Sequence, residues 1–304
     1  MNRLKGIVFG IVSGISYGTN PLFGVPLLRH GMSVDLMLFY RFSIATLLLL
    51  PFMALLKVRL GVGAREFAAL SMLGVSFMIG SMTLFYSYTL MPAGIASTIL
   101  FLFPVFTALI LVLFFREKLK LSVVIALLLS FLGVALLYRG DSGEPVSPLG
   151  IAVVVMSALS YAAYLVAVNK SKTLAKMSGM KISFYTLLTA SVAFLACTLC
   201  LGSFALPQDG FEILNILGLA IFPTIISITT IAYAIIYSDS TTAAILGVFE
   251  PLTAVFIGVM VFGEAFTPGL ALGILAIISA VTITVYCGSG RRRRKRKVFV
   301  QAEP

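Results

Sequence analysis

Apolar residues form long continuous stretches along this chain, separated by short polar segments. A helix needs about 20 apolar residues to cross the hydrocarbon core of a bilayer, which is about 30 Å thick. We predict a transmembrane helix in each of ten stretches, at residues 6–28, 35–56, 67–90, 93–115, 121–138, 149–168, 182–202, 213–237, 240–262 and 269–287.

The continuity of these stretches favours helices over a membrane barrel. Strands of an outer-membrane barrel alternate lipid-facing apolar residues with polar residues, and the stretches of this chain do not alternate in that way. In lipid every backbone polar group must pair within the protein, and a helix achieves this within its own segment. The predicted fold class is therefore an all-α integral membrane protein.

The first stretch is interpreted as a helix of the mature protein and not as a signal peptide. It follows Arg3 and Lys5, as the apolar part of a signal peptide would. It is long, however, contains Asn20, Pro21 and Pro26, and lacks a clear small-residue cleavage site.

The composition excludes an ordinary soluble fold. Hydrophobic residues make up 60% of the 304 residues and charged residues only 11%, whereas a soluble domain has about 25% charged residues. A soluble protein of this size has too little interior to hide so much apolar surface.

The few charges are distributed unevenly between the predicted loops. With the amino terminus placed in the cytoplasm, 19 of the 22 Lys and Arg residues fall on the inner side, Arg29 and Arg139 fall outside, and Arg41 lies within the second helix. Positive residues concentrate on the cytoplasmic side of membrane proteins. We therefore expect both termini in the cytoplasm and the chain in a bacterial plasma (inner) membrane.

A basic tail, residues 291–304, begins with the run R-R-R-R-K-R-K. Such runs also occur in nuclear signals and nucleic-acid-binding segments. Here the run follows the tenth helix directly, where each cation gains about 1 kcal/mol from anionic lipid headgroups. We expect membrane lipids, and no nucleic acid, as the partner of this tail.

The chain contains an internal repeat. At an offset of 144, Gly6, Ile7, Ser13, Ser16 and Tyr17 match Gly150, Ile151, Ser157, Ser160 and Tyr161; at an offset of 147, Tyr86, Ala96, Pro104 and Glu117 match Tyr233, Ala243, Pro251 and Glu264. The repeats are predicted at 1–145 and 146–290. Because each contains five helices, an odd number, the second must enter the membrane from the opposite side, which makes the repeats inverted. Inverted repeats are typical of transporters that alternate access to a central cavity.

Two stretches of the sequence resemble a known family. They are Y-S-Y-T-L-M-P-A-G-I-A-S-T-I-L-F-L-F-P-V-F (86–106) with R-E-K-L at 116–119, and Y-A-I-I-Y-S-D-S-T-T-A-A-I-L-G-V-F-E-P-L-T-A (233–254) with G-E-A-F at 263–266. They resemble the two EamA repeats of the drug/metabolite transporter superfamily. The most specific element is the proline and glutamate thirteen residues apart in both halves. The resemblance implies a ten-helix bundle with a central cavity and mostly export of amino acids or other small metabolites.

Two charged residues within the predicted helices are candidates for solute binding. Glu250 lies in the ninth helix beside Pro251, where a charged side chain costs about 2.5 kcal/mol or more. Its alternative role is that of a protonated acid bonding a neighbouring helix. Arg41 could bind a substrate carboxylate or pair with Glu250, and it could equally extend its long side chain to the headgroups.

Polar and aromatic side chains share faces of several predicted helices. Spacings of three and four place residues on one face, as for Tyr17 and Asn20 in the first helix and for Tyr161 and Tyr164 in the sixth. We predict that these faces line the cavity, together with Tyr86, Ser97, Phe101, Tyr233 and Gly247. Each tyrosine could instead serve helix packing or anchor the chain at the membrane interface.

Small residues and prolines predict packing and gating positions. Gly10 and Gly14 belong to a glycine stripe with Gly6 and Gly18, which lets another helix approach closely. Pro21 is expected to bend the first helix and make its outer end a moving gate. Pro104 and Pro251 occupy matching positions of the two repeats and are expected to be packing or gating positions, since a proline removes one backbone hydrogen bond from its helix.

The sequence offers little chemistry for an enzyme. The pattern G-I-S-Y-G at 14–18 resembles a nucleophile elbow, but it lies within a predicted helix, and His30 is the only histidine. Cys197 and Cys200 form a single C-T-L-C pair in an apolar segment and are interpreted as free thiols. We expect no enzyme activity, metal or cofactor.

The predicted function is secondary transport, as an exporter of small metabolites such as amino acids by alternating access. The alternatives are a channel, since a bundle with a polar centre can conduct, or a membrane protein with a structural or signalling role and no transport.

Overall fold

The fold was determined from a computed structural model, which describes residues 2–55, 57–58, 60–116, 121–138, 146–174, 177–238, 243 and 246–288. Within these ranges the chain is helical and contains no strand. The basic tail 291–304, Glu117 and the side chain of Cys287, on which some of the expectations depend, lie outside this description.

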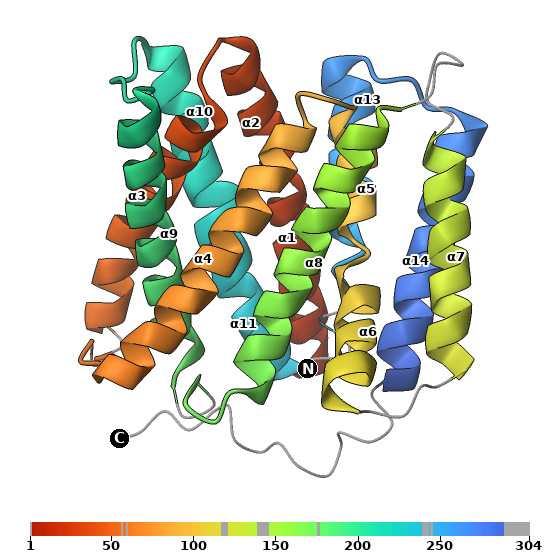
Figure 1. Ribbon diagram of the computed structural model, residues 1–304, viewed down its shortest axis with the longest axis horizontal. Helices are drawn as coiled ribbons and strands as arrows, with labels where there is room; N and C mark the ends of the chain where they lie inside the picture. Colours follow the sequence, from red (N-terminus) through yellow and green to blue (C-terminus); the bar gives the residue numbers. More distant parts are fainter. Residues whose placement is uncertain are drawn as a thin grey trace.

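Helices run side by side through the bundle (Figure 1). Those of the first half are α1 (Asn2–Gly18), α2 (Asn20–Arg29), α3 (Val34–Leu55), α4 (Ala64–Ser87), α5 (Ala93–Leu100), α6 (Phe103–Phe115) and α7 (Leu121–Tyr138). Those of the second half are α8 (Pro148–Lys170), α9 (Gly179–Leu201), α10 (Gly210–Ala220), the π-helical segment η2 (Ile221–Ile226), α11 (Ser227–Tyr237), α13 (Phe249–Phe262) and α14 (Pro268–Gly288).

The all-α membrane fold predicted from the apolar stretches is confirmed. In the described residues, seven helical segments are long and apolar enough to cross a membrane, and two shorter apolar helices occupy Leu121–Leu137 and Phe249–Phe262. The remaining predicted span is built by α1 and α2 together. Figure 1 shows that α1 begins at the lower edge of the bundle whereas α8 begins at the upper edge, so the halves run in opposite directions.

The structure corrects the expectation of continuous helices at 6–28 and 93–115. The first span is interrupted at Thr19, and Pro21 lies in the first turn of α2. The fourth span is interrupted at residues 101–102, and Pro104 lies in the first turn of α6. The cause is the same in both spans, because proline has no N–H to donate and is favoured in the first turn of a helix, where that N–H would have no partner.

The second half has two irregular segments of the same kind. Residues 247–248 form a turn before α13, one position away from the residues that match the break in the fourth span, and Pro251 follows in the first turn of α13. The eighth span stays continuous but widens into η2 around Pro223. Within the described residues, four spans therefore carry irregular backbone.

Helices of one half pack mainly on helices of the other. The helix α1 packs on α11 and, at the equivalent place, α8 packs on α4, while α3 packs on α9, α5 on α13 and α7 on α14. Hydrogen bonds follow the same symmetry. The Ser13 hydroxyl donates to the Ser227 carbonyl at 3.0 Å, and the matching Ser157 hydroxyl donates to the carbonyl of Gly80, the residue that matches Ser227, at 2.6 Å. The repeat is thus present in three dimensions.

Glu264, in the segment between α13 and α14, joins the two halves. Its carboxylate accepts hydrogen bonds from the backbone N–H groups of Ala93 at 2.8 Å and Gly94 at 3.2 Å, in the first turn of α5. A side chain at Gly94 or Gly258 would collide with this carboxylate. Since a helix N-terminus favours an anion, the glutamate of the proline–glutamate pattern caps a helix of the other half.

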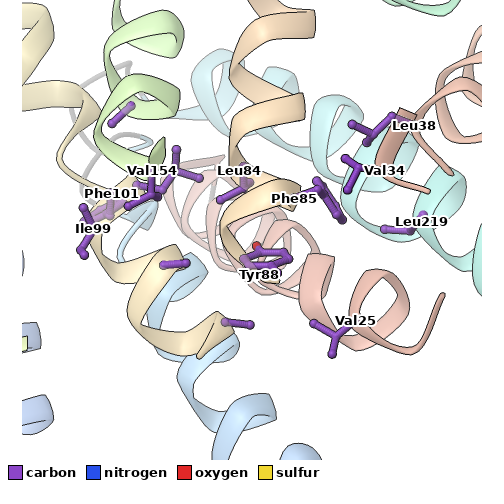
Figure 2. Close-up of a cluster of buried hydrophobic side chains, with 14 of the residues drawn as sticks. Val25, Val34, Leu38, Leu84, Phe85, Tyr88, Ile99, Phe101, Val154 and Leu219 are labelled. Atoms are coloured by element: carbon purple, nitrogen blue, oxygen red, sulfur yellow. The ribbon is translucent and has the colours of Figure 1, made fainter. Parts of the chain in front are cut away.

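Buried apolar side chains from both halves fill the centre of the bundle. Figure 2 shows part of this core, with Leu84, Phe85 and Tyr88 from the end of α4 near Val154 and Leu219 of the second half. The break at residues 101–102 lies within this core, since Phe101 and Leu102 both belong to it.

Candidate solute-binding site

Polar side chains gather where the interrupted spans meet. Eight of them form a group that we name the polar cluster: Tyr17, Arg41, Tyr88, Ser97, Tyr161, Tyr164, Thr224 and Glu250. They come from α1, α3, the end of α4, α5, α8, η2 and α13. Irregular backbone at membrane depth is tolerated where it is buried in protein or lines a cavity, and substrate sites of transporters form at such interruptions.

Arg41 is held inside the bundle. Its side chain is only 3% exposed, and its Nε donates a hydrogen bond to Oγ1 of Thr224 at 2.9 Å. The guanidinium lies 5.2 Å from the ring centre of Phe42 and 5.4 Å from that of Phe85, distances at which a cation is attracted to an aromatic face. The alternative of an Arg41 that extends to the headgroups is therefore wrong.

Thr224 owes its position to the π-helical segment. The hydroxyl of Thr224 donates to the carbonyl of Leu219 at 2.9 Å, five residues earlier, and thereby leaves its oxygen free to accept from Arg41. A separation of five residues is that of a π-helix and not of an α-helix. The Arg41–Thr224 bond joins α3 of the first half to η2 of the second.

Glu250 lies in the first turn of α13 and is partly exposed. Tyr17, Tyr88 and Tyr161 all interact electrostatically with this carboxylate. Tyr17 and Tyr88 also interact with Arg41, but Arg41 and Glu250 form no ion pair in the described structure. Tyr17 and Tyr88 thus lie near both charges, and the two charges do not neutralise each other by contact.

Hydrogen bonds order the surroundings of the tyrosines. The hydroxyl groups of Tyr88 and Ser97 lie 3.2 Å apart, which ties the end of α4 to α5. Asn20, at the break in the first span, is 2% exposed and donates from Nδ2 to the carbonyl of Tyr17 at 2.9 Å. Its Oδ1 is one of the buried polar atoms of the described chain that have no hydrogen-bond partner, and such an acceptor is costly to leave unpaired.

Aromatic rings form one wall beside the cluster. The ring centre of Tyr161 lies 4.7 Å from that of Phe103 and 6.1 Å from that of Tyr164. Phe101 is fully buried and contacts Phe103 edge to face at 6.0 Å. Tyr17, Tyr161 and Tyr164 are each partly exposed, so this wall presents hydroxyl groups as well as ring faces.

Two tyrosines predicted to line the cavity lie away from the polar cluster. Tyr86 is 45% exposed, and Tyr233 is 41% exposed and packs on Phe9 and Tyr237 with ring centres 5.2 and 6.3 Å away. Because Tyr86 and Tyr88 differ by two positions near a helix end, they face in different directions. Gly247 belongs to the turn before α13 and accepts a hydrogen bond from the N–H of Glu250 at 3.0 Å.

The glycine stripe of α1 faces the start of the ninth span. A Cβ atom on Gly14 would lie 2.9 Å from Phe249 Cβ and 3.0 Å from the carbonyl oxygen of Leu246. A Cβ atom on Gly10 would lie 2.5 Å from Leu246 Cδ1. The small residues therefore permit a close helix contact, and that contact holds the turn that carries Glu250 against α1.

The sequence interpretation missed Tyr88 and Thr224. Tyr88 lies in the same Y-S-Y stretch as Tyr86. At the repeat offset of 147, however, only Tyr86 matches a second tyrosine, Tyr233. Thr224 follows Pro223, and a polar residue beside a proline in an apolar stretch was the available signal. Thr224 could not be linked to Arg41 before the π-helical segment was known.

Comparison with known proteins identifies the class. The EamA-like transporter family matches residues 4–139 and 148–286. The chain therefore belongs to the EamA-like transporter family, it contains two repeats of that family, and the protein is a membrane transporter of the EamA type.

Individual relatives agree with this class. The chain is 24% identical over 272 residues to the uncharacterized transporter YdfC of Bacillus subtilis (strain 168), which covers 89% of this chain and 87% of that protein. It is 29% identical over 192 residues to an uncharacterized transporter of Archaeoglobus fulgidus, which covers 62% and 66% of the respective chains. A crystal structure with 16% sequence identity has the same fold, with a TM-score of 0.67 over 93% of this chain and 96% of that one.

Proposed function

We propose that the protein is a secondary transporter that exports small metabolites, such as amino acids, from the cytoplasm by alternating access. The two repeats, residues 1–145 and 146–290, would exchange conformations around the polar cluster. Both termini would lie in the cytoplasm of a cell whose plasma (inner) membrane holds the protein, with the tail 291–304 at the anionic headgroups.

The polar cluster carries this proposal. It combines one guanidinium, one carboxylate and several hydroxyl groups with aromatic walls, at the place where the interrupted spans of both halves meet. Small-molecule sites generally combine apolar and aromatic walls with a few well-placed polar groups. Groups of both charge signs suit solutes that carry polar and charged groups on a small apolar body.

Contacts between the halves at the end that holds His30 support alternating access. His30 Nδ1 lies 3.1 Å from Glu212 Oε1 of α10, and the Arg29 guanidinium lies 5.1 Å from the ring centre of Phe262 in α13. Both contacts join the end of α2 to helices of the second half. Under the proposed orientation this end faces outward, and these contacts would have to separate for the solute to leave.

Reconstitution into liposomes tests the proposal. The purified protein would be incorporated into vesicles loaded in turn with amino acids, nucleobases or organic acids, and efflux would be measured with and without a pH gradient. We expect protein-dependent efflux of one of these classes, and a dependence on the gradient if protons drive export. Efflux equal to that of protein-free vesicles for all three classes would contradict the proposal.

A further inference from the structure

His30 lies between two carboxylates of the other half at one end of the bundle. It follows the last residue of α2, and α2 packs on α10 at the upper edge of the bundle (Figure 1). Nδ1 of its ring lies 3.1 Å from Oε1 of Glu212, and Nε2 lies 3.7 Å from Oδ2 of Asp209. Each nitrogen of the ring therefore faces a different carboxylate.

The charge of the ring decides how many of these contacts are favourable. A neutral imidazole carries one N–H, so it can donate towards one of the two carboxylates and must turn a lone pair towards the other. An imidazolium carries an N–H on both nitrogens and a positive charge. His30 also caps the C-terminus of α2, where the helix dipole favours a cation. Protonation thus makes every contact of the ring with its polar surroundings attractive.

Backbone hydrogen bonds hold both carboxylates in place. Oε2 of Glu212 accepts from the N–H of Gln208 at 2.7 Å, and Oδ1 of Asp209 accepts from the N–H of Glu212 at 2.8 Å, as the N-cap of α10. The side chain of Glu212 is only 6% exposed, whereas that of His30 is 42% exposed. The carboxylate of Glu212 cannot turn away into water, and the imidazole can exchange a proton with the solution.

Other charged and titratable groups around His30 are engaged elsewhere. On α2 itself, the guanidinium of Arg29 lies over the ring of Phe262 in α13. From the remaining neighbours, Asp35 of α3 accepts from the Ser203 hydroxyl, Tyr40 of α3 donates to the carbonyl of Ala205, and Glu264 after α13 accepts from the first turn of α5. Histidine ordinarily changes its charge between pH 5 and 8, whereas carboxylates and guanidinium groups ordinarily keep theirs. Among the described groups of this end, His30 is therefore the one suited to respond to external pH.

We propose that His30, Asp209 and Glu212 form a proton-operated latch, which we name the outer latch. In it the imidazolium holds α2 closed on α10, and loss of its proton releases the contact. A proton that is bound more tightly in one conformer shifts the population towards that conformer. Acidification of the solution at this end therefore favours closure. The inference rests on the proposed transport function and orientation, to which it adds control of solute exit by external pH.

Thiol labelling of the full-length protein in lipid nanodiscs tests the latch without any solute. With Cys197, Cys200 and Cys287 replaced, one cysteine is placed at Leu36, which is 5% exposed in the wall of a cavity of about 280 Å³ that His30 and Glu212 also line. A second protein carries its cysteine at Leu206, which is 74% exposed at the same cavity. The ratio of the two labelling rates at each pH removes the pH dependence of the thiol reaction itself and reports the opening of this end.

The charge of His30 can be followed in the same protein. His30 is the only histidine of the chain, so protein that carries isotope-labelled histidine and no affinity tag gives one imidazole signal in an NMR titration. This comparison needs no substitution at His30. The variants are His30→Gln, Glu212→Gln and Asp209→Asn, and the matched control is Arg29→Gln, which removes a cation that faces α13. Gel filtration and the apparent Tm report whether each variant is folded.

We expect the labelling ratio of Leu36 to Leu206 to be about 3-fold or more lower at pH 5 than at pH 8, because a charge-assisted hydrogen bond is gained on protonation. The midpoint of this decline should coincide with that of imidazole protonation. His30→Gln and Glu212→Gln should abolish the decline, and Asp209→Asn should reduce it, since asparagine still caps α10. Arg29→Gln should retain it.

Several results would overturn the inference. They are a labelling ratio that stays constant or rises on acidification, midpoints of labelling and of imidazole protonation that differ, and a decline that persists in folded His30→Gln. The proposed transport function is judged separately by the liposome screen. Efflux without a labelling response would remove the latch and leave transport standing, whereas a labelling response without efflux of any solute would contradict transport and leave the pH-dependent closure standing.

Discussion

The hydroxyl group of Ser13 in α1 donates a hydrogen bond to the carbonyl of Ser227 in α11 at 3.0 Å, and Ser157 in α8 makes the matching bond to Gly80 in α4 at 2.6 Å. The two bonds join equivalent helix pairs of the two repeats. They hold α1 and α8, the helices that contribute Tyr17 and Tyr161, against the neighbouring half.

Removal of either hydroxyl should destabilise the bundle by a similar amount. A hydrogen bond between membrane helices contributes about 0.6 kcal/mol on average, so we expect Ser13→Ala and Ser157→Ala each to lower the apparent Tm modestly and the double variant to lower it by the sum. Thermal unfolding in detergent measures this. The matched control is Ser130→Ala, because Ser130 bonds only the carbonyl of Ala126 in its own helix. A control loss as large as that of Ser13→Ala would refute the role of the helix-to-helix bond.

The glycine stripe predicts graded effects of added methyl groups. A Cβ atom on Gly18 would lie 2.6 Å from the backbone oxygen of Glu250 and 2.6 Å from Thr253 Cβ, whereas a Cβ atom on Gly10 would meet the flexible end of Leu246. We expect Gly18→Ala to lower the apparent Tm and transport more than Gly10→Ala, because backbone cannot move aside as a side chain can.

Leucine at Gly10 or Gly14 should abolish folding or transport, since it separates α1 from the ninth span. Gly179→Ala is the control, because nothing lies within 4 Å of a Cβ atom there, and it should leave both properties intact. Wild-type transport and apparent Tm in Gly10→Leu and Gly14→Leu would mean that the stripe is not a packing surface.

Glu250 is expected to serve transport through its ionisation. Glu250→Gln keeps the size and the hydrogen-bonding capacity of the side chain but cannot ionise. We expect a folded, membrane-inserted protein that loses net transport or loses the pH dependence of transport, while exchange of solute for solute persists. Measurements of efflux and of solute exchange from liposomes at several pH values distinguish a loss of net transport from a loss of pH dependence. Glu66→Gln, which changes a partly exposed carboxylate in the first turn of α4, should behave as the wild type. An unchanged pH profile in Glu250→Gln would assign the residue a structural role.

The proposed orientation predicts which loops a membrane-impermeant thiol reagent can reach. With Cys197, Cys200 and Cys287 replaced, a cysteine at Gln208 should be labelled on intact cells, and a cysteine at Lys172 only after permeabilisation. Both positions are exposed in the structure. A reporter fused after Lys297 should be active on the cytoplasmic side. The reverse labelling pattern, or a reporter signal from outside the cell, would invert the orientation.

The positions of the spans could be predicted from the sequence because bilayer thickness sets a length that apolar stretches reveal directly. The breaks at Thr19 and at residues 101–102 could not. A proline in an apolar stretch permits a kink, a break or a first-turn position, and packing against neighbouring helices selects between them. Pro104 and Pro251 indicated irregular backbone. They did not indicate the turn that precedes each of them.

The candidate site could be predicted in part. Arg41 and Glu250 are recognisable because charge is rare in membrane spans, and Tyr17 and Tyr161 because they match across the repeat. The direction of the Tyr88 side chain depends on how its helix ends, and that of Thr224 depends on the π-helical register. Sequence spacing does not encode either effect. The same effect places Tyr86 at the surface.

Counterflow in liposomes tests alternating access most directly. Vesicles containing the purified protein would be loaded with a high concentration of the unlabelled solute identified by the efflux screen and diluted into a trace of the labelled solute. A site that faces one side at a time must exchange inner for outer solute, so we predict a transient accumulation of label above its equilibrium level, which Gly14→Leu should abolish. Label that rises to equilibrium without an overshoot, at a rate independent of the internal solute, would show a continuous pore and contradict the account.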